Sequence, residues 1–121
     1  MAKFGKTSLS RLETCDKRLR DVLNEAIQHY DFSVVCGHRD KEAQNRAYEE
    51  GNSQRQWPKS KHNTSPSLAV DVIPYPTGYE DVDEFYIMAS YILAAAIKLN
   101  VKIKWGGHWR TFKDYPHFEL G

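Results

Sequence analysis

The sequence predicts a small α+β domain in which helices pack on a mostly antiparallel sheet. Its 121 residues match the usual size of one domain. Hydrophobic residues make up 40% of the chain and aromatic residues 12%, a content that excludes a disordered tail. Short β-branched runs and helical patterns follow one another in the order α-β-α-loop-β-α-β-β, which is typical of this fold class.

A long amphipathic helix is expected near the start of the chain, over residues 9–29. Ser10 and Glu13 have the spacing of a capping box at its beginning. One face of this helix is predicted to be buried, because apolar side chains recur at helical spacing. They are Leu9, Leu12, Cys15, Leu19, Val22, Leu23, Ala26 and Ile27.

The later elements carry their own local signals. The run FSVVC at residues 32–36 is rich in β-branched residues and predicts a strand. Asp40 is expected to cap a short helix over residues 41–50, which stops at Gly51. A polar loop over 52–67 and a strand over 68–73 are expected to follow. The next element is a helix over 81–99, which is apolar on most sides and is therefore expected to be buried. The chain is expected to end with a strand over 101–105, a turn at Gly106-Gly107 and a last strand over 117–120.

The charge pattern excludes several classes of function. Lys and Arg number 17 against 16 Asp and Glu, so we expect no nucleic acid partner, which would favour a clear basic excess. The basic stretch at Arg55, Lys59 and Lys61 is explained more simply by a polar loop. No run approaches the ~20 apolar residues of a membrane span, so membrane insertion is not expected. The N-terminal residues also lack the apolar stretch of a signal peptide.

Three residues are candidate metal ligands: His62, Asp71 and His117. Asp71 lies inside the apolar strand LAVDVI, and a buried carboxylate needs a metal or a charged partner. A salt bridge to Arg39 would satisfy it equally well on composition alone. The two histidines favour the metal, because catalytic zinc sites take three protein ligands and leave a fourth position open for water.

Two carboxylates near the last ligand have candidate roles. Asp114 lies just before His117, and Pro116 between them favours a bend that could bring Asp114 beside the metal, where it would act as the general base. The alternative is an exposed loop Asp. Glu119 shares a strand face with His117 and could orient that ligand, although a plain salt bridge is equally compatible with the sequence.

Three further residues are candidate substrate contacts. Arg39 follows a strand end, where an Arg could hold a substrate carboxylate or stabilise an oxyanion, against the alternative of a surface Arg. Ser60 is either a hydrogen-bond donor to substrate or an ordinary loop residue. His108 lacks a recognisable ligand frame and reads as a polar loop residue.

Four motifs together resemble the zinc D-Ala-D-Ala carboxypeptidase and L-alanyl-D-glutamate peptidase family, above all its small phage endolysin members. They are Ser60-x-His62, Pro66-Ser67-x-Ala69-Val70-Asp71, Trp105-Gly106-Gly107 and Asp114-x-Pro116-His117-Phe118-Glu119. The resemblance covers about residues 30–121. It implies the Hedgehog/D-Ala-D-Ala-peptidase fold and one zinc ion held by the residues that match His62, Asp71 and His117. It also implies a base at Asp114 and contacts of Arg39 and Ser60 with substrate or oxyanion.

The resemblance implies hydrolysis of an amide bond in the peptidoglycan stem peptide, most simply the L-Ala–D-Glu bond. The alternatives are a D,D-carboxypeptidase or dipeptidase acting on D-Ala-D-Ala, and a non-catalytic, zinc-stabilised wall-binding module on the same fold. The sequence departs from the family pattern in two places. The step from His62 to Asp71 is longer than in many members, and His108 stands where Asp is common, so that His108 is a further candidate substrate contact.

The chain is expected to form one catalytic domain over residues 1–121, without a separate cell-wall-binding domain. We also expect a monomer that is made in a host cytoplasm and reaches the wall after release, with a holin as the agent that gives access. These expectations follow from the endolysin resemblance together with the missing signal peptide.

Overall fold

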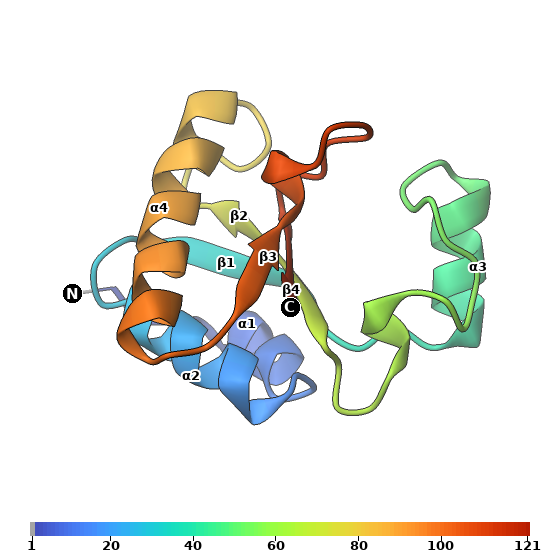
Figure 1. The fold of residues 1–121 in the computed structure, drawn as a ribbon, viewed down its shortest axis with the longest axis horizontal. Coiled ribbons are helices and arrows are strands. Elements are labelled where there is room, and N and C mark those ends of the chain that lie inside the picture. Colours follow the sequence, from blue (N-terminus) through green and yellow to red (C-terminus); the bar gives the residue numbers. More distant parts are fainter. Residues whose placement is uncertain (1) are drawn as a thin grey trace.

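The computed structural model describes residues 2–121, which form a helical layer and a four-stranded sheet (Figure 1). The elements are α1 (Lys6–Leu12), α2 (Lys17–Ala26), β1 (Phe32–Cys36), α3 (Lys41–Glu49), the 3₁₀ turn η1 (Lys61–Asn63), β2 (Ala69–Pro74), α4 (Val82–Lys98), β3 (Ile103–Trp105), the 3₁₀ turn η2 (Gly106–His108) and β4 (His117–Leu120). The α+β class predicted from the sequence is confirmed. No helix within the described residues is long and apolar enough to cross a membrane.

The sheet has the strand order β1-β2-β4-β3, and each neighbouring pair runs antiparallel. In the pairing of β2 with β4, Asp71 lies opposite His117 and Val70 lies opposite Phe118. Side chains alternate between the two faces of a strand, so this register puts Asp71 and His117 on one face. Val70 and Phe118, both fully buried, lie on the other.

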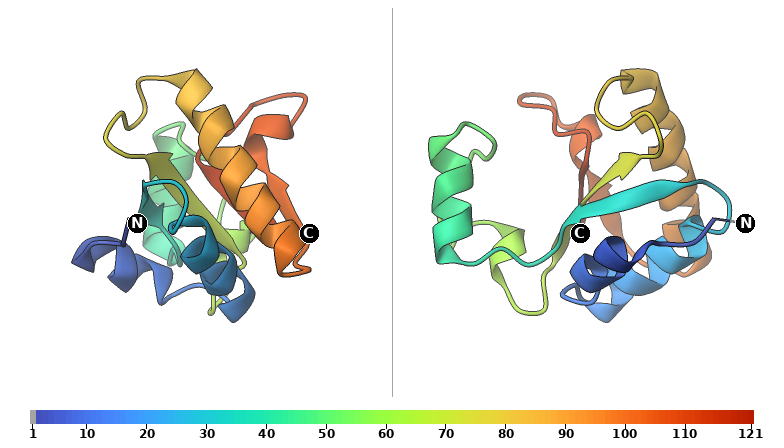
Figure 2. Two further views of the ribbon diagram at one scale, coloured as in Figure 1. Left: turned by 90° about the vertical axis from the view of Figure 1, so that its left-hand side faces the viewer. Right: turned by 180° about the vertical axis from the view of Figure 1, so that it is seen from behind.

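The hydrophobic core lies between the sheet and three of the helices. α1 packs on β1, α4 packs on β2 and β3, and α2 packs against α4. The views in Figures 1 and 2 show that α3 lies apart from these helices, on the far side of the sheet. The polar face of β2 and β4 is therefore turned away from the core and toward α3.

The single helix expected over residues 9–29 is wrong, because the chain breaks between Leu12 and Lys17. The break is made by tertiary hydrogen bonds: Asp16 N donates to Ser67 O (2.8 Å), and Ser67 N donates to Thr14 O (2.9 Å). Asp16 then caps α2 by accepting from Arg18 N. The capping box expected at Ser10 and Glu13 is absent, since Ser10 lies inside α1.

The long helix α4 has the expected position but is not buried on all sides. Phe85, Met88 and Ile92 face the core. On its outer face Tyr91 and Ile97 are exposed, Ile97 by 81%. The short helix α3 was predicted more closely: the Asp40 side chain accepts from Ala43 N at its start, and Gly51 follows its end with a φ of 80°.

Candidate active site

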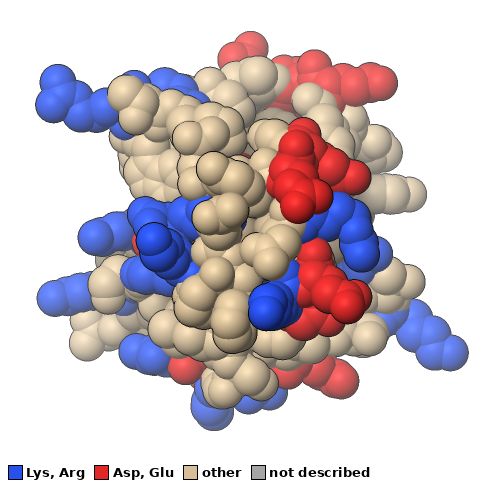
Figure 3. Space-filling view, turned by 90° about the vertical axis from the view of Figure 1, so that its right-hand side faces the viewer, with Lys and Arg blue, Asp and Glu red and all other residues tan. Residues whose placement is uncertain are grey.

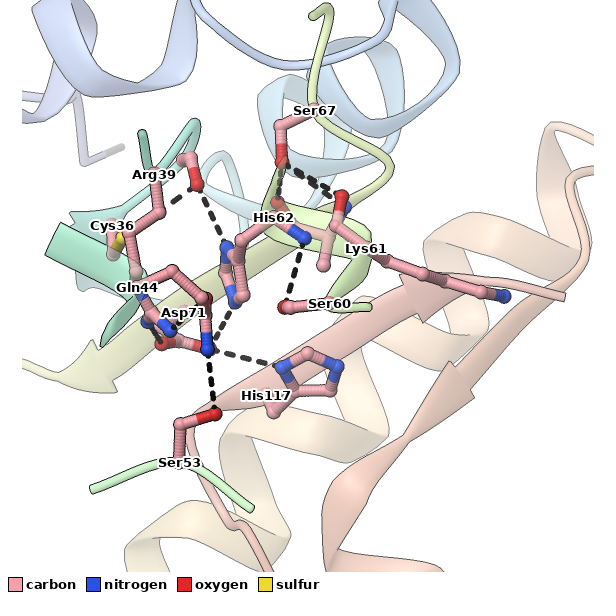
Figure 4. A network of polar contacts seen from close by, with 12 residues as sticks. Cys36, Arg39, Gln44, Ser53, Ser60, Lys61, His62, Ser67, Asp71 and His117 are labelled. Carbon is pink, nitrogen blue, oxygen red and sulfur yellow. Dashed lines mark hydrogen bonds and ion pairs between the residues drawn. The ribbon is translucent and has the colours of Figure 1, made fainter. Parts of the chain in front are cut away.

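Three polar side chains converge on the face of the sheet that is turned toward α3. His62 Nε2 and His117 Nδ1 each lie 3.2 Å from Asp71 Oδ1. One ligand atom from each of these residues falls within 4.8 Å of the others, which makes the group a candidate metal site. Figure 4 shows the two imidazoles approaching the carboxylate from different segments of the chain.

The secondary structure explains why these residues meet. Asp71 and His117 are cross-strand partners in β2 and β4. His62 comes from η1, a short turn capped by Ser60, whose Oγ accepts from His62 N at 3.2 Å. Ser60 is buried, and its side chain thus has a structural role whatever else it contacts.

The far nitrogen of each imidazole is held by a second partner. His62 Nδ1 lies 2.7 Å from Gly37 O, an atom that can only accept a hydrogen bond. His117 Nε2 lies 2.8 Å from Glu119 Oε1, while Lys61 Nζ pairs with Glu119 Oε2 at 3.2 Å. Glu119 therefore makes both contacts considered from the sequence, one to His117 and one to a lysine. With these N–H groups donated outward, each imidazole presents its other nitrogen to Asp71.

This donor set fits a divalent metal ion. A neutral imidazole whose outer N–H is already donated would turn a lone pair toward the Asp71 carboxylate, so either protons or a cation must lie between them. Burial lowers the imidazole pKa values, but other effects outweigh it. The charge of Asp71 raises the pKa of His62, and hydrogen bonds to Asp71 and Glu119 raise the pKa of His117. Burial would raise the pKa of Asp71, yet the two histidines hold it far below its usual range. The cluster is thus arranged for positive charge at its centre.

Arg39 approaches the same carboxylate from its other oxygen. Its Nη2 donates to Asp71 Oδ2 at 3.3 Å, and its backbone N donates to His62 O at 2.7 Å. The salt bridge weighed in the sequence as an alternative to a metal is therefore present together with the metal-type cluster. Oδ1 of Asp71 faces the two histidines, and Oδ2 faces the arginine.

Gln44 on α3 is a residue of the site that the sequence analysis missed. It is fully buried and uses its whole hydrogen-bonding capacity. Its Oε1 accepts from Arg39 Nη1 (3.0 Å) and Asn63 Nδ2 (3.1 Å), and its Nε2 donates to Ser53 Oγ (2.9 Å) and Arg55 O (2.6 Å). A glutamine on a polar helix gives no signal of this role, which arises from the loops that fold around it.

Asp114 is brought beside the cluster by a tight bend before β4. His117 N donates to Asp114 O, and Asp114 N donates to Gly106 O. A Cβ on Gly106 would lie 2.3 Å from Asp114 O, so this close approach requires glycine. Burial raises the pKa of Asp114 above its ordinary value, and the negative charge of Asp71 raises it further.

The three candidate metal ligands line a cleft of about 590 Å³ together with Arg39, Ser60, Asp114 and Glu119. Its lining comes in part from the segment after α3 and in part from the loop between η2 and β4. In the ribbon of Figure 1 that loop lies on the sheet side of the molecule and α3 lies across from it. Figure 3 looks onto the side that carries α3, where basic side chains gather mainly left of centre and acidic ones mainly to the right. The lining residues are Arg39, Asn52, Ser53, Gln54, Arg55, Lys59, Ser60, Lys61, His62, Asp71, Tyr79, Trp109, Phe112, Asp114, Pro116, His117 and Glu119.

The structure brings together all but one of the site residues predicted from the sequence. His108 does not line the cleft; it is exposed and its ring packs edge-on against Trp105, with 4.9 Å between ring centroids. The aromatic lining at Tyr79, Trp109 and Phe112 was not foreseen. Phe112 has a φ of 46°, in the left-handed region of backbone conformation. The sequence could not predict this, because a non-glycine residue adopts such a φ only when the surrounding structure imposes it.

Comparison with known proteins identifies the class of molecule. The sequence profile of the family described as phage L-alanyl-D-glutamate peptidase matches residues 1–120. The chain belongs to this family. The family resemblance stated from the sequence motifs is thereby confirmed, as is the expected class of enzyme, a peptidase.

A solved structure supports the same assignment for the fold. This family member is similar to the L-Ala D-Glu endopeptidase ChiX of Serratia marcescens, with 29% sequence identity and a TM-score of 0.84. The match covers 98% of this chain and 90% of ChiX. The peptidase fold expected from the resemblance therefore extends over nearly the whole chain.

Proposed function

We propose that this protein is a zinc-dependent peptidoglycan peptidase that hydrolyses the L-Ala–D-Glu bond of the stem peptide. The observation that carries the proposal is the His62–Asp71–His117 cluster in the cleft of a chain that belongs to the phage L-alanyl-D-glutamate peptidase family. The similarity to an L-Ala D-Glu endopeptidase supports the choice of bond.

His62 Nε2, Asp71 Oδ1 and His117 Nδ1 are the atoms that would hold the zinc ion. Two neutral imidazoles and one carboxylate are a known ligand set for catalytic zinc. When bound, zinc supplies a Lewis acid that polarises a carbonyl group and lowers the pKa of water. Gly37 O and Glu119 keep the two imidazoles oriented toward the ion by accepting their outer N–H groups.

Asp114 is the general base of the proposed reaction. Its carboxylate lines the cleft and accepts no side-chain hydrogen bond within the described part of the chain, so it is available to a water molecule. It takes a proton from the attacking water and returns it to the leaving amine of the D-Glu residue. A raised pKa suits this double role, because the group must both accept and release the proton.

Arg39 and Ser60 are proposed to contact substrate. The guanidinium of Arg39 is aimed by Asp71 and Gln44, and its positive charge can stabilise the developing oxyanion. Ser60 lines the cleft beside the cluster and can donate its hydroxyl proton while Oγ still accepts from His62 N. His108 stays a predicted contact only, because it lies outside the cleft lining.

The proposal includes the setting of the enzyme. We infer that residues 1–121 act as one monomeric catalytic domain on the cell wall, after release from a host cytoplasm with the help of a holin. The family, which is a phage family, supports this setting. No nucleic acid partner is proposed, because the net charge is only +1.

Digestion of purified muropeptides tests the proposal. The zinc-loaded protein is expected to release fragments with a new N-terminal D-Glu and a new C-terminal L-Ala, detected by mass spectrometry, and metal analysis is expected to find one zinc per chain. Release of D-Ala alone would favour a D,D-carboxypeptidase. Stoichiometric zinc without any cleavage would favour the non-catalytic wall-binding module.

A further inference from the structure

Two cationic side chains line the cleft without an acidic partner. Arg39 pairs with Asp71, and Lys61 pairs with Glu119. Arg55 and Lys59 line the same cleft, yet neither forms a salt bridge with any residue of the described chain, 2–121. Their charges are thus left available to a ligand.

The backbone of Arg55 is held by two hydrogen bonds to side chains of the same segment and of α3. Arg55 O accepts from Gln44 Nε2 at 2.6 Å, and Arg55 N donates to Ser53 Oγ at 3.1 Å. Gln44 is itself fully buried and also binds Arg39 Nη1. One side chain therefore contacts both arginine-bearing segments, so the backbone at Arg55 needs no further ordering when a ligand binds to its exposed side chain.

The charge of the cleft favours an anion on this side. Four cationic side chains line it against three carboxylates, and a bound divalent metal would add further positive charge. The opposite side is lined by Trp109, Phe112 and Asp114, none of which is cationic. An anionic group of the substrate would accordingly bind beside Arg55 and Lys59. A guanidinium is well suited to a carboxylate, because it can donate two parallel hydrogen bonds.

The proposed substrate carries such a group next to the scissile bond. In an L-Ala–D-Glu linkage the glutamyl residue contributes its amine to the bond. One of its two carboxyl groups continues the peptide, and the other remains free. We propose that Arg55, assisted by Lys59, forms a subsite for this free carboxylate, so that the enzyme discriminates against stem peptides in which it is amidated. The inference rests on the proposed function and adds a determinant of specificity to it.

Matched synthetic peptides test the subsite. Three substrates share the L-Ala–D-Glu bond: one with all carboxyl groups free, one amidated only at the glutamyl carboxyl, and one amidated only at the C-terminus. The zinc-loaded wild type should cleave the glutamyl-amidated peptide with kcat/KM about tenfold lower than the free peptide, in line with the value of a hydrogen bond to a charged group. Amidation of the C-terminus should have little effect.

Variants then assign the preference to the cleft. Arg55→Gln should lose about tenfold in kcat/KM on the free peptide and leave the glutamyl-amidated peptide nearly unchanged, so that the preference disappears. Lys59→Gln should reduce the preference in part. Arg46→Gln is the matched control, because Arg46 is exposed on α3 and does not line the cleft. It should retain the wild-type preference.

The outcomes separate the two proposals. Equal losses of Arg55→Gln on free and amidated peptides would overturn the subsite, and so would a preference that depends on the C-terminal carboxyl. Cleavage of all three peptides with equal efficiency by the wild type would also overturn it, while supporting the proposed function. Failure of the zinc-loaded wild type to cleave any of them would contradict the proposed function itself.

Discussion

Asp114 is the one acidic residue of the described cleft lining whose carboxylate is not engaged by a neighbouring side chain. Asp71 Oδ1 faces two histidines and its Oδ2 faces Arg39, while Glu119 binds His117 and Lys61. Both of these carboxylates are therefore engaged with positively charged or proton-donating neighbours. Asp114 alone combines a raised pKa with an open face toward the cleft.

Asp114→Asn is expected to lower kcat by about 10²–10⁴-fold, the usual contribution of a general acid–base group. Zinc content should stay at one per chain, because Asp114 is not part of the His62–Asp71–His117 cluster. Steady-state kinetics on the stem peptide and metal analysis of the same preparation measure the two effects. Asp21→Asn is the control, since Asp21 pairs with Lys17 on the exposed face of α2, away from the cleft. A variant with near-wild-type kcat would show that the base is a different group.

The sequence was informative for residues whose context was unusual. An Asp inside an apolar strand, and a His that opens the last strand, both stand out against the alternation around them. Gln44 does not, because glutamine is common on polar helices and its burial depends on segments at Ser53, Arg55 and Asn63 that fold over it. Local sequence patterns carry no information about such long-range hydrogen bonds.

Among the elements, the helical segments before β1 show how tertiary contacts override periodicity. Apolar spacing is continuous from Leu9 to Ile27, and this favoured one helix. The backbone bonds between Ser67 and residues Thr14 and Asp16 interrupt it, and they join the start of the chain to the segment just before β2. The strands were easier to predict, because their alternation matches the two faces of the observed sheet.

Asp16→Ala is expected to destabilise the fold by about 1 kcal/mol, the typical value of an N-cap side chain. The carboxylate accepts from Arg18 N at 2.9 Å at the start of α2, and alanine cannot replace that acceptor. Urea denaturation followed by circular dichroism measures the free energy of unfolding. Asp21→Ala, within the same helix but away from its cap, should cost less. If both variants lost the same free energy of unfolding, the Asp16 cap would contribute no more to stability than an ordinary surface residue.

On the scale of the whole molecule, the candidate metal ligands tie distant parts of the chain together. His62 lies in η1, Asp71 in β2 and His117 in β4. A metal held by all three binds the folded state and has no preformed site in the unfolded chain. Metal binding therefore increases the free energy of unfolding.

Zinc at about a hundredfold excess over its Kd should stabilise the fold by about 2.7 kcal/mol, and a chelator should remove this gain. Calorimetry with zinc and with EDTA measures the change in Tm. The gain should shrink as the pH falls, because protons compete for His62 and His117, whose raised pKa values strengthen that competition. His117→Ala should show no zinc-dependent Tm shift, and a shift equal to that of the wild type would contradict the ligand assignment.

The hydrogen bond from Arg39 N to His62 O, at 2.7 Å, has a consequence for how the enzyme could be altered. The bond joins the two ends of the segment from Arg39 to His62. This segment, which connects β1 to β2, is therefore a closed loop. That stretch contains α3, Arg55 and Lys59, whereas Asp71, Asp114 and His117 lie outside it. Because lengthening a closed loop costs little entropy, the part of this stretch around Arg55 and Lys59 can be resized, provided that Gln44 and Ser60, which position Arg39 and His62, are kept. The substrate preference of the enzyme could then be changed without changing the residues that cleave the bond.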